Sequence, residues 1–328
     1  MRLGSICTGL LAAVVAMANS GSAPAQGYPS RPVNLIVPFP AGGSTDWLAR
    51  MLAQKLEQRI KGATVVVENR PGGANVVAAV LVAKSAPDGH TLMIGTSTTF
   101  AINASVFKKL AYDPARDFVP VALVSGVPFV LVANPSLGVK TVPDLIKAAK
   151  AKPGGLAYAS TGAGSAANLY MVLLRNALGI PMTAVPYKGN APGLQDTIAG
   201  HVSLMFSDLL SALPHIRSGK LVALGVSTKD RAPAATDLQT LHEAGVSGYD
   251  ASAWQMIVAP AGTPKDIVDR LNAELNAIVR DPVVNRDING RGHIAVVTPP
   301  VAELQRFVAS EIARWAKVVE AAGAKGTQ

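Results

Sequence analysis

Two short segments rich in glycine and hydroxyl side chains hold the residues of this chain that are best suited to bind an anion. The first segment consists of Gly42, Gly43, Ser44, Thr45 and Asp46. It follows an apolar run and is followed by an amphipathic run. Glycine lets backbone amides approach a ligand because no side chain stands in the way. The first amides of a helix lack internal partners and lie at the positive end of the helix dipole, so they can hold an anion without an arginine.

A similar turn occupies residues 159–168, which read Ala-Ser-Thr-Gly-Ala-Gly-Ser-Ala-Ala-Asn. Two such turns that face each other across a cleft would form a receptor for a small carboxylate. For either turn alone, the alternative is a tight turn with a Ser, Thr or Asp cap and no ligand.

Enzyme chemistry finds little support in the motifs. The stretch 162–167 fits the dinucleotide pattern G-x-G-x-x-A, but no Asp or Glu lies at 181–187, about 20 positions on, to bind a ribose. Gly95 and Ser97 lack the second glycine of a G-x-S-x-G elbow, and no two of the five histidines have the spacing of zinc ligands. Asp46 and Asp208 could form a carboxylate pair, and the alternative is that Asp46 is a helix-start residue. We therefore expect a binding protein with no catalytic residues, no cofactor and no metal.

The N-terminus reads as a secretory signal peptide over residues 1–25. Arg2 precedes an apolar run, and Ala23-Pro24-Ala25 places small residues where signal peptidase needs them. The apolar run is shorter than the roughly 20 residues of a spanning helix, so an uncleaved anchor is the minor alternative. The single cysteine of the chain, Cys7, lies in this segment, so the exported protein has no disulfide or thiol chemistry. These features predict a periplasmic location.

Length and composition indicate two globular units. About 300 residues follow the signal peptide, and 49% of the chain is hydrophobic, which suffices for two cores. The formal charge of +9 is scattered, without a Lys/Arg run, which argues against a nucleic-acid partner. The excess positive charge would help to steer an anionic ligand, although only weakly.

Apolar runs alternate with helical patterns in both halves of the chain, which predicts the same α/β architecture used twice, with ligands at the carboxyl ends of mostly parallel strands. We expect strands at 33–39, 64–68, 91–95, 119–124, 129–133, 156–159, 183–187, 202–206, 223–227 and 254–259. We expect helices at 46–60, 75–85, from Thr141 onward, 167–178, 193–199, 209–218, 263–279 and 300–322.

From residue 28 to about residue 324 the chain resembles the Bug family, the extracytoplasmic solute receptors of tripartite tricarboxylate transport systems. The motifs that carry this resemblance are Tyr-Pro-Ser-Arg-Pro at 28–32, Val-Pro-Phe-Pro-Ala-Gly-Gly-Ser-Thr-Asp at 37–46, Glu-Asn-Arg-Pro-Gly at 68–72, Pro-Asp-Gly-His-Thr-Leu at 87–92, Val-Pro-Tyr-Lys-Gly at 185–189, Ser-Ala-Leu-Pro-His-Ile at 211–216 and Ala-Pro-Ala-Gly-Thr-Pro at 259–264. Together these motifs are highly specific.

The resemblance implies a Venus-flytrap periplasmic binding protein fold, in which two α/β lobes are joined by two crossing strands. Lobe 1 would comprise 28–126 plus 254–328, and lobe 2 would comprise 127–253. The resemblance also implies that backbone amides and ordered waters hold a ligand carboxylate. We expect a monomer whose partner is a membrane permease. A periplasmic sensor for a membrane histidine kinase, or a flytrap-fold enzyme, would be the alternatives.

Carried over residue by residue, the resemblance places ligand contacts in both turns and at the ends of further strands. These candidates are Phe39, Ala41, Gly42, Gly43, Ser44, Thr45 and Asp46 in the first turn, Ser160, Thr161, Gly164, Ser165 and Asn168 in the second, and Thr96, Ser97, Tyr187 and Asp208 along the remainder.

Three positions depart from the family's usual pattern. Many relatives carry His where this chain has Asn168, Trp47 stands where an aliphatic residue is usual, and the order Ser207-Asp208 puts the role of Asp208 in doubt. In the cleft, an ionised Asp208 would repel a second ligand carboxylate and favour a hydroxyl or ammonium group. We therefore expect one carboxylate with a neutral or donor-bearing tail rather than a tricarboxylate. The alternative is that Asp208 only caps the helix 209–218.

Overall fold

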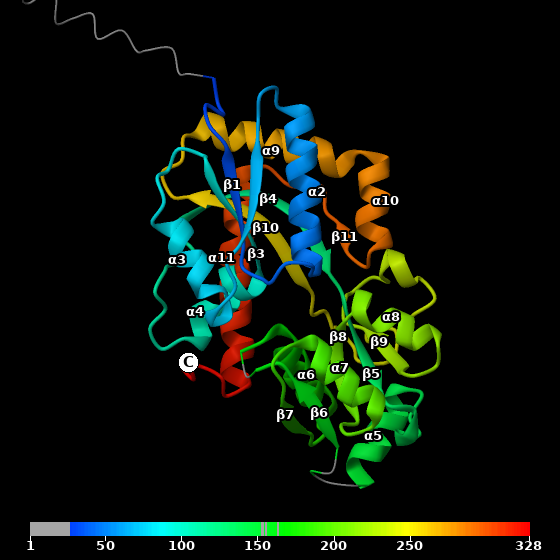
Figure 1. Cartoon of the computed structure of the whole chain (residues 1–328). Helices are drawn as coiled ribbons and strands as arrows, with labels where there is room; N and C mark the ends of the chain where they lie inside the picture. Colours follow the sequence, from blue (N-terminus) through cyan, green and yellow to red (C-terminus); the bar gives the residue numbers. More distant parts are fainter. Residues whose placement is uncertain (1–26, 152–153, 155, 163) are drawn as a thin grey trace, which may run out of the picture.

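Two mixed β-sheets, each covered by helices on both faces, organise the chain into two α/β lobes (Figure 1). The computed structural model describes residues 27–151, 154, 156–162 and 164–328. The predicted signal peptide, 1–25, therefore lies outside the described residues. Within the described part of the chain, each helix is too short or insufficiently apolar to cross a bilayer.

The sheet of the first lobe has the strand order β11-β4-β10-β3-β1-β2. β1 pairs in parallel with β2 and β3, whereas β10 lies antiparallel between β3 and β4, and β11 pairs antiparallel with β4. β1 to β4 therefore all run in one direction, and β10 and β11 run in the other. The strands are β1 (Val33–Val37), β2 (Val65–Asn69), β3 (Thr91–Thr96), β4 (Phe118–Val127), β10 (Ala253–Pro260) and β11 (Ile294–Ala295).

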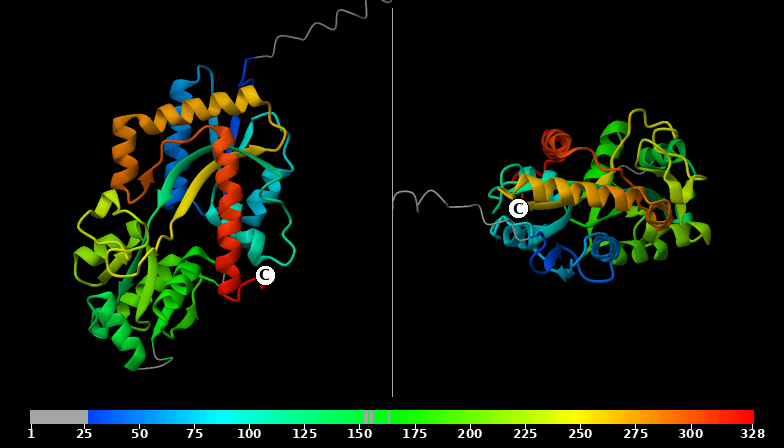
Figure 2. Two further views of the ribbon diagram at one scale, coloured as in Figure 1. Left: turned by 180° about the vertical axis from the view of Figure 1, so that it is seen from behind. Right: turned by 90° about the horizontal axis from the view of Figure 1, so that it is seen from above.

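Alternating apolar side chains bury both faces of this sheet. Leu35 packs in the core on one face, and the next residue, Ile36, packs in the core on the other. The face of Leu35 is covered by α2 (Ser44–Arg59), α9 (Lys265–Arg280) and α10 (Pro282–Gly290). The face of Ile36 is covered by α3 (Val76–Ala83), α4 (Asn103–Val106) and α11 (Val301–Ala321), with the short helices η1 (Gly73–Asn75) and η2 (Thr98–Ile102) leading into α3 and α4 (Figure 2).

The sheet of the second lobe has the order β7-β6-β8-β5-β9, in which β5 runs opposite to the other four strands. Its strands are β5 (Phe129–Ala133), β6 (Ala157–Ser160), β7 (Thr183–Pro186), β8 (Leu204–Asp208) and β9 (Val222–Val226). One face packs against α5 (Val142–Ala151) and α6 (Ala166–Leu178), and the other packs against α7 (Asn190–Ala199) and α8 (Leu209–Arg217). The short helices η3 (Pro135–Leu137) and η4 (Pro233–Ala235) lie in connections.

The two sheets are linked by two connections that lie close together (Figure 2). β4 ends at Val127 and β5 begins at Phe129, so Pro128 alone separates a strand of one sheet from a strand of the other. The chain returns after β9 through residues 227–252 and enters the first sheet as β10. β5 and β10 are the strands that enter from the opposite lobe without a crossover helix, which explains why each is antiparallel to its neighbours.

The expected strands and helices are all present, and the structure adds several short elements. The polar residues after β3 begin η2 and α4, and α10 and the two-residue β11 follow α9. These segments are short and lack a clean apolar period, so pattern alone does not reveal them. A larger difference concerns the core, because one apolar cluster contains residues of both lobes. Trp315 on α11 lies with its ring 5.7 Å from that of Tyr170 on α6.

Candidate functional site

The candidate ligand-binding residues follow strands that end at facing edges of the two sheets. β4 leaves the first sheet and continues almost directly as β5, so the carboxyl ends of β1 to β4 point toward the second lobe. β6 to β9 run opposite to β5, so their carboxyl ends point back toward the first lobe. This is the edge at which open α/β sheets bind ligands. The lobes touch here, because a Cβ placed on Gly164 would lie 2.6 Å from Cγ1 of Val106 on α4.

The first turn delivers an uncapped helix N-terminus to this edge. α2 begins at Ser44 with the extended residue Gly43 as its N-cap, and no side chain of the described residues caps it. The carbonyl of Gly43 accepts the first helical bond from the amide of Trp47 at 2.9 Å. Gly42 has φ +86°, a conformation that favours glycine. Ala41, Gly42 and Gly43 are exposed, so a ligand can approach these amides.

A buried carboxylate holds the shape of this turn. Asp46 is 4% exposed, and its Oδ2 accepts hydrogen bonds from the amide of Gly42 at 2.9 Å and from Arg50 Nε at 3.1 Å. Its Oδ1 accepts from Asn69 Nδ2 at 2.9 Å and pairs with Arg50 at 3.0 Å. Burial alone would raise the pKa of Asp46, but the hydrogen bonds from Arg50, Gly42 and Asn69 outweigh it and hold the pKa below its usual value. Asp46 therefore stays ionised and fixes the turn.

Asn69 also supports the first turn, and the sequence did not single it out. Its Nδ2 also donates to the carbonyl oxygen of Phe39 at 3.0 Å, so it joins the start of the turn to Asp46. The motif at 68–72 contained this signal, but the sequence alone does not show that β2 ends beside the first turn. Arg70, in the same motif, pairs with Glu68.

The second turn is built differently, because its helix is capped by its own side chain. Ser165 Oγ accepts a hydrogen bond from the amide of Asn168 at 3.3 Å and donates to the carbonyl of Gly162 at 2.8 Å. Ser160 Oγ and Tyr158 OH both donate to Asn168 Oδ1, at 3.0 and 2.9 Å. The structure thus gathers Ser160, Ser165 and Asn168 into one polar cluster, and Thr161 lies half-buried beside it.

The end of β3 contributes a buried hydroxyl. Ser97 is completely buried, and its Oγ has no hydrogen-bond partner among the described residues. An unpaired buried hydroxyl costs roughly 1–3 kcal/mol, so such a group is expected to meet a ligand or a water. Thr96, one residue earlier, is half-buried and lies opposite Gln255 in the neighbouring strand.

The last two candidates already have partners within the second lobe. Tyr187 OH donates to Asp196 Oδ2 at 2.8 Å. Asp208 caps α8, where its Oδ1 accepts from the amide of Ser211 at 2.9 Å, as the alternative for this residue predicted. The capping bond uses one carboxylate oxygen of a half-buried side chain, so a ligand contact through Asp208 stays a prediction.

Trp47 packs against the protein rather than standing free beside the turn. The guanidinium of Arg291 lies 4.6 Å from the centre of its ring, and the His293 ring lies 6.1 Å away. The segment that follows α10 therefore supports the first turn of α2 from beneath.

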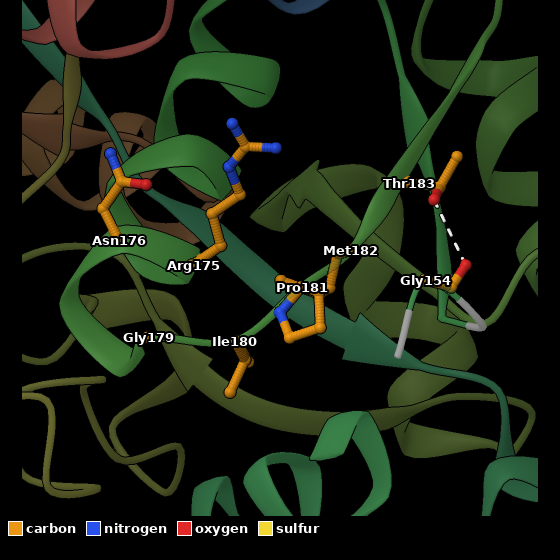
Figure 3. Close-up of a pocket in the computed structure, with 8 residues that line it drawn as sticks. All are labelled: Gly154, Arg175, Asn176, Gly179, Ile180, Pro181, Met182 and Thr183. Carbon is orange, nitrogen blue, oxygen red and sulfur yellow. Dashed lines mark hydrogen bonds between the residues drawn. The ribbon is translucent and has the colours of Figure 1, made fainter. Parts of the chain in front are cut away.

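A separate hollow lies away from these residues. It has a volume of about 610 Å³ at the far end of the second lobe, beside α6 and the start of β7 (Figure 3). Its described lining residues are Gly154, Arg175, Asn176, Gly179, Ile180, Pro181, Met182 and Thr183, of which Arg175 alone is charged. None of the candidate ligand-binding residues lines it. Among the described residues, no cluster of His, Cys, Asp and Glu has the makings of a metal site.

Comparison with known proteins gives consistent matches along the chain. Residues 48–324 match the family model described as "Tripartite tricarboxylate transporter family receptor". The chain is 38% identical over 302 residues to Protein BugT of Bordetella pertussis (strain Tohama I), which covers 92% of each protein.

Two solved structures are similar throughout. R. palustris Rpa4515 with adipate is 39% identical, with a TM-score of 0.82, and the match covers 90% of this chain and 98% of that one. MatC (Rpa3494) from Rhodopseudomonas palustris with bound malate is 34% identical, with a TM-score of 0.77, and the match covers 89% of this chain and 100% of that one.

Proposed function

Because the chain belongs to the family of tripartite tricarboxylate transporter receptors, we propose that it is an extracytoplasmic solute receptor that binds a small organic carboxylate between its two lobes. One observation carries the proposal. The exposed glycine turn leaves the N-terminus of α2 uncapped by any described side chain, at the sheet edge that faces the second lobe. Free helix N-terminal amides with a favourable dipole form an anion site.

The carboxylate is held by neutral donors in this proposal. Arg50 is paired with Asp46, and Arg70 is paired with Glu68, so these two cations already have partners. Backbone amides of α2 and the hydroxyl of Ser97 would supply the hydrogen bonds, and the second turn would close over the ligand with side chains such as Ser160. Arg70→Gln would then lower stability with little effect on binding.

We propose a dicarboxylate between malate and adipate in length as the first ligand class to test. Both acids are bound in structures of related receptors. The carboxylate of Asp208 lies at the N-terminus of α8, where the helix dipole offsets part of its charge. Its repulsion of a second ligand carboxylate is therefore weaker than its charge alone predicts, and the expectation of a donor-bearing tail becomes one of two ligand classes to compare.

The remaining parts of the proposal concern location, partners and motion. The signal-like segment 1–25 supports export to the periplasm, and the family supports delivery of the ligand to the permease subunits of a tripartite transporter by a monomeric receptor. We propose that lobe 1 (28–126 plus 254–328) and lobe 2 (127–253) rotate about their two connections when ligand binds. Small-angle scattering with and without ligand should show a smaller radius of gyration in the bound state.

A thermal-shift screen followed by calorimetry tests the function. The panel comprises malate, succinate, adipate, citrate, glutamate and aromatic acids, and a ligand present at 100 times its Kd should add about 2.7 kcal/mol to the free energy of unfolding. Loss of uptake of the best ligand after gene deletion would support a role in transport. Normal uptake with a lost transcriptional response would indicate a sensor instead, and a panel without any binder would contradict the carboxylate receptor.

A further inference from the structure

A chain of four polar side chains runs through the interior of the first lobe, from the first turn of α2 to the segment after α10. Gln255 Nε2 donates to Thr45 Oγ1 at 2.7 Å, and Gln255 Oε1 accepts from Ser125 Oγ at 2.6 Å. Ser125 Oγ in turn lies 3.3 Å from Nδ1 of His293. All four residues are buried: Gln255 is 1% exposed, Thr45 6%, Ser125 0% and His293 2%.

Within this row of four side chains, Gln255 joins Thr45 to Ser125. It lies on β10, directly opposite Thr96 of β3 on one side and Ser125 of β4 on the other. Side chains directly opposite in antiparallel strands project from the same face of the sheet, so Gln255 lies beside the end of β3, where Ser97 is buried. Its amide group then reaches across to Thr45, which is the second residue of α2 and offers one of the free amides of the anion site.

His293, at the far end of this row of polar side chains, is held by packing and carries no charge at pH 7. Burial lowers the pKa of His293 to about 4, so its ring is neutral at pH 7 and can serve as a hydrogen-bonding partner of Ser125. Its ring also lies against Trp47, which is itself covered by Arg291. Both ends of the chain therefore meet α2, one at Thr45 and the other at Trp47.

Since α2 has no side-chain cap of its own, something else must hold its first turn in place. Asp46 does this from the solvent side, through Gly42 and Asn69. On the core side, the hydrogen bond from Gln255 is the contact that fixes Thr45. β10 and β4 are also the strands that connect the first lobe to the second, so the same amide joins the anion-binding turn to the connection between the lobes.

We propose that Gln255 is a positioning residue of the ligand site, which orients the first turn of α2 through Thr45 and ties that turn to the two connecting strands. The proposal rests on the proposed function, because it assigns a role to Gln255 within the same carboxylate site. Gln255 does not touch ligand in this proposal. It acts by holding the backbone amides at residues 44–46 in the geometry that an anion requires.

Residue-resolved hydrogen exchange of the free protein tests the mechanical part. Gln255→Leu should make the amides of residues 47–50 exchange about tenfold faster, because the first turn of α2 opens more often. Thr45→Val removes the same bond in a near-isosteric way and should give the same acceleration. Thr45→Ser keeps the accepting hydroxyl and should restore slow exchange. The double variant Thr45→Val/Gln255→Leu should be no faster than either single variant.

Thr298→Val is the matched control. Thr298 Oγ1 is buried and accepts a hydrogen bond from the amide of Leu123 on β4 at 2.9 Å, so its loss removes a comparable bond from the same sheet. This variant should lower the melting temperature by a similar amount and leave exchange at 47–50 unchanged. If Gln255→Leu and Thr298→Val accelerate exchange at 47–50 equally, Gln255 is merely structural and the proposal is wrong.

The affinity arm uses the tightest acid of the panel, measured by calorimetry. Gln255→Leu and Thr45→Val should each weaken it about tenfold, while Thr45→Ser and Thr298→Val stay within about twofold of the unmodified protein. Weaker binding without faster exchange would show that Gln255 contacts the ligand and would overturn the positioning role. If no acid binds the unmodified protein, the proposed function fails, and the exchange measurements still decide whether Gln255 holds the turn.

Discussion

The two glycine-rich turns contain the same dipeptide, Gly-Ser, and use it in opposite ways. In the second turn Ser165 is the N-cap of α6, and its hydroxyl accepts a hydrogen bond from the amide of Asn168 in the first turn of that helix. In the first turn Gly43 is the N-cap of α2, and the serine that follows is already inside the helix. A shift of one residue in the helix start therefore decides whether the first amides are satisfied by the protein or left for a ligand.

The carboxylate of Asp46 explains this difference. It turns back from the first turn of α2 to bind the amide of Gly42, and Asn69 and Arg50 hold it there. The side chain at the equivalent helix position of the second turn is Asn168. It instead accepts hydrogen bonds from the hydroxyls of Tyr158 and Ser160. The start of α2 thus has no side-chain cap among the described residues, whereas the polar side chains of the second turn already bond within that turn.

Among the variants that test the difference between the two turns, removal of the Asp46 carboxylate should change stability and ligand affinity most. Asp46→Ala would leave the amide of Gly42 and the side chain of Asn69 without their charged acceptor, and should cost about 2–3 kcal/mol of stability at pH 7 together with most of the ligand affinity. Chemical denaturation and calorimetry measure both quantities.

The pH dependence of Asp46→Asn provides the control. The folded-state pKa of Asp46 is lowered, so the stability it contributes is present above its unfolded pKa of about 4 and is lost as the pH falls through the folded value. The stability gap between the unmodified protein and Asp46→Asn should therefore narrow below about pH 4. A gap that stays constant down to pH 2 would show that the carboxylate does not hold the turn as an anion.

Valine at the two glycines separates binding from structure. A Cβ on Gly43 would meet only the carbonyl oxygen of Pro40 at 3.7 Å, so Gly43→Val should keep the fold and lower affinity by at least about 100-fold, by occupying the space of the anion. A Cβ on Gly164 would lie 2.6 Å from Val106, so Gly164→Val should push the lobes apart and lower stability as well. Equal affinity for Gly43→Val and the unmodified protein would move the anion site away from α2.

Two serine variants sharpen the comparison at a smaller scale. Ser165→Ala removes the cap of α6 and should cost about 1 kcal/mol of stability. Ser44→Ala should cost much less, because Ser44 lies inside α2 and caps nothing. Thermal melts of the two variants measured side by side are sufficient. Equal losses would mean that the two helices begin at equivalent serines, and a larger loss for Ser44→Ala would make Ser44 the cap.

Asp208→Asn should have the smallest effect. Asn caps a helix nearly as well as Asp, so stability should change by less than about 0.5 kcal/mol. A changed ranking of mono-, di- and tricarboxylates would place Asp208 in the ligand pocket, whereas an unchanged ranking would leave it as the cap of α8 alone. Tight binding of citrate by the unmodified protein would contradict the expectation that tricarboxylates are disfavoured.

The strands and long helices were predictable from the chain, because Val/Ile/Leu runs and the 3.6-residue period of α9 and α11 record which faces are buried. The turns were predictable as anion-binding candidates, since glycine and hydroxyl residues stand where strands lead into helices. The hydrophobic pattern of the sequence does not show which distant segments contact each other. Gln255 and Thr45 are 210 residues apart, and nothing in the local sequence around either one predicts their hydrogen bond.

The same limit applies to caps. Gly-Ser stands at the start of a helix in both turns, and only the contacts of Asp46 and Asn168 decide which residue becomes the N-cap. The expectation that backbone amides serve the anion in both turns stays a prediction, and the contacts of the second turn differ from those of the first. In the second turn, the amides of Gly162 and Asn168 already have acceptors in Ser160 and Ser165.

The apolar cluster that Trp315 and Tyr170 share bears on how this molecule comes apart. α11 covers one face of the first sheet, yet its buried side chains pack in the same cluster as Phe206 and Leu131 of the second sheet. Neither lobe can lose its structure without stripping apolar contacts from the other, so heating should melt both in one cooperative transition with equal calorimetric and van't Hoff enthalpies. A chain that stops before residue 300 would expose this surface on the second lobe, and such a fragment should aggregate rather than fold.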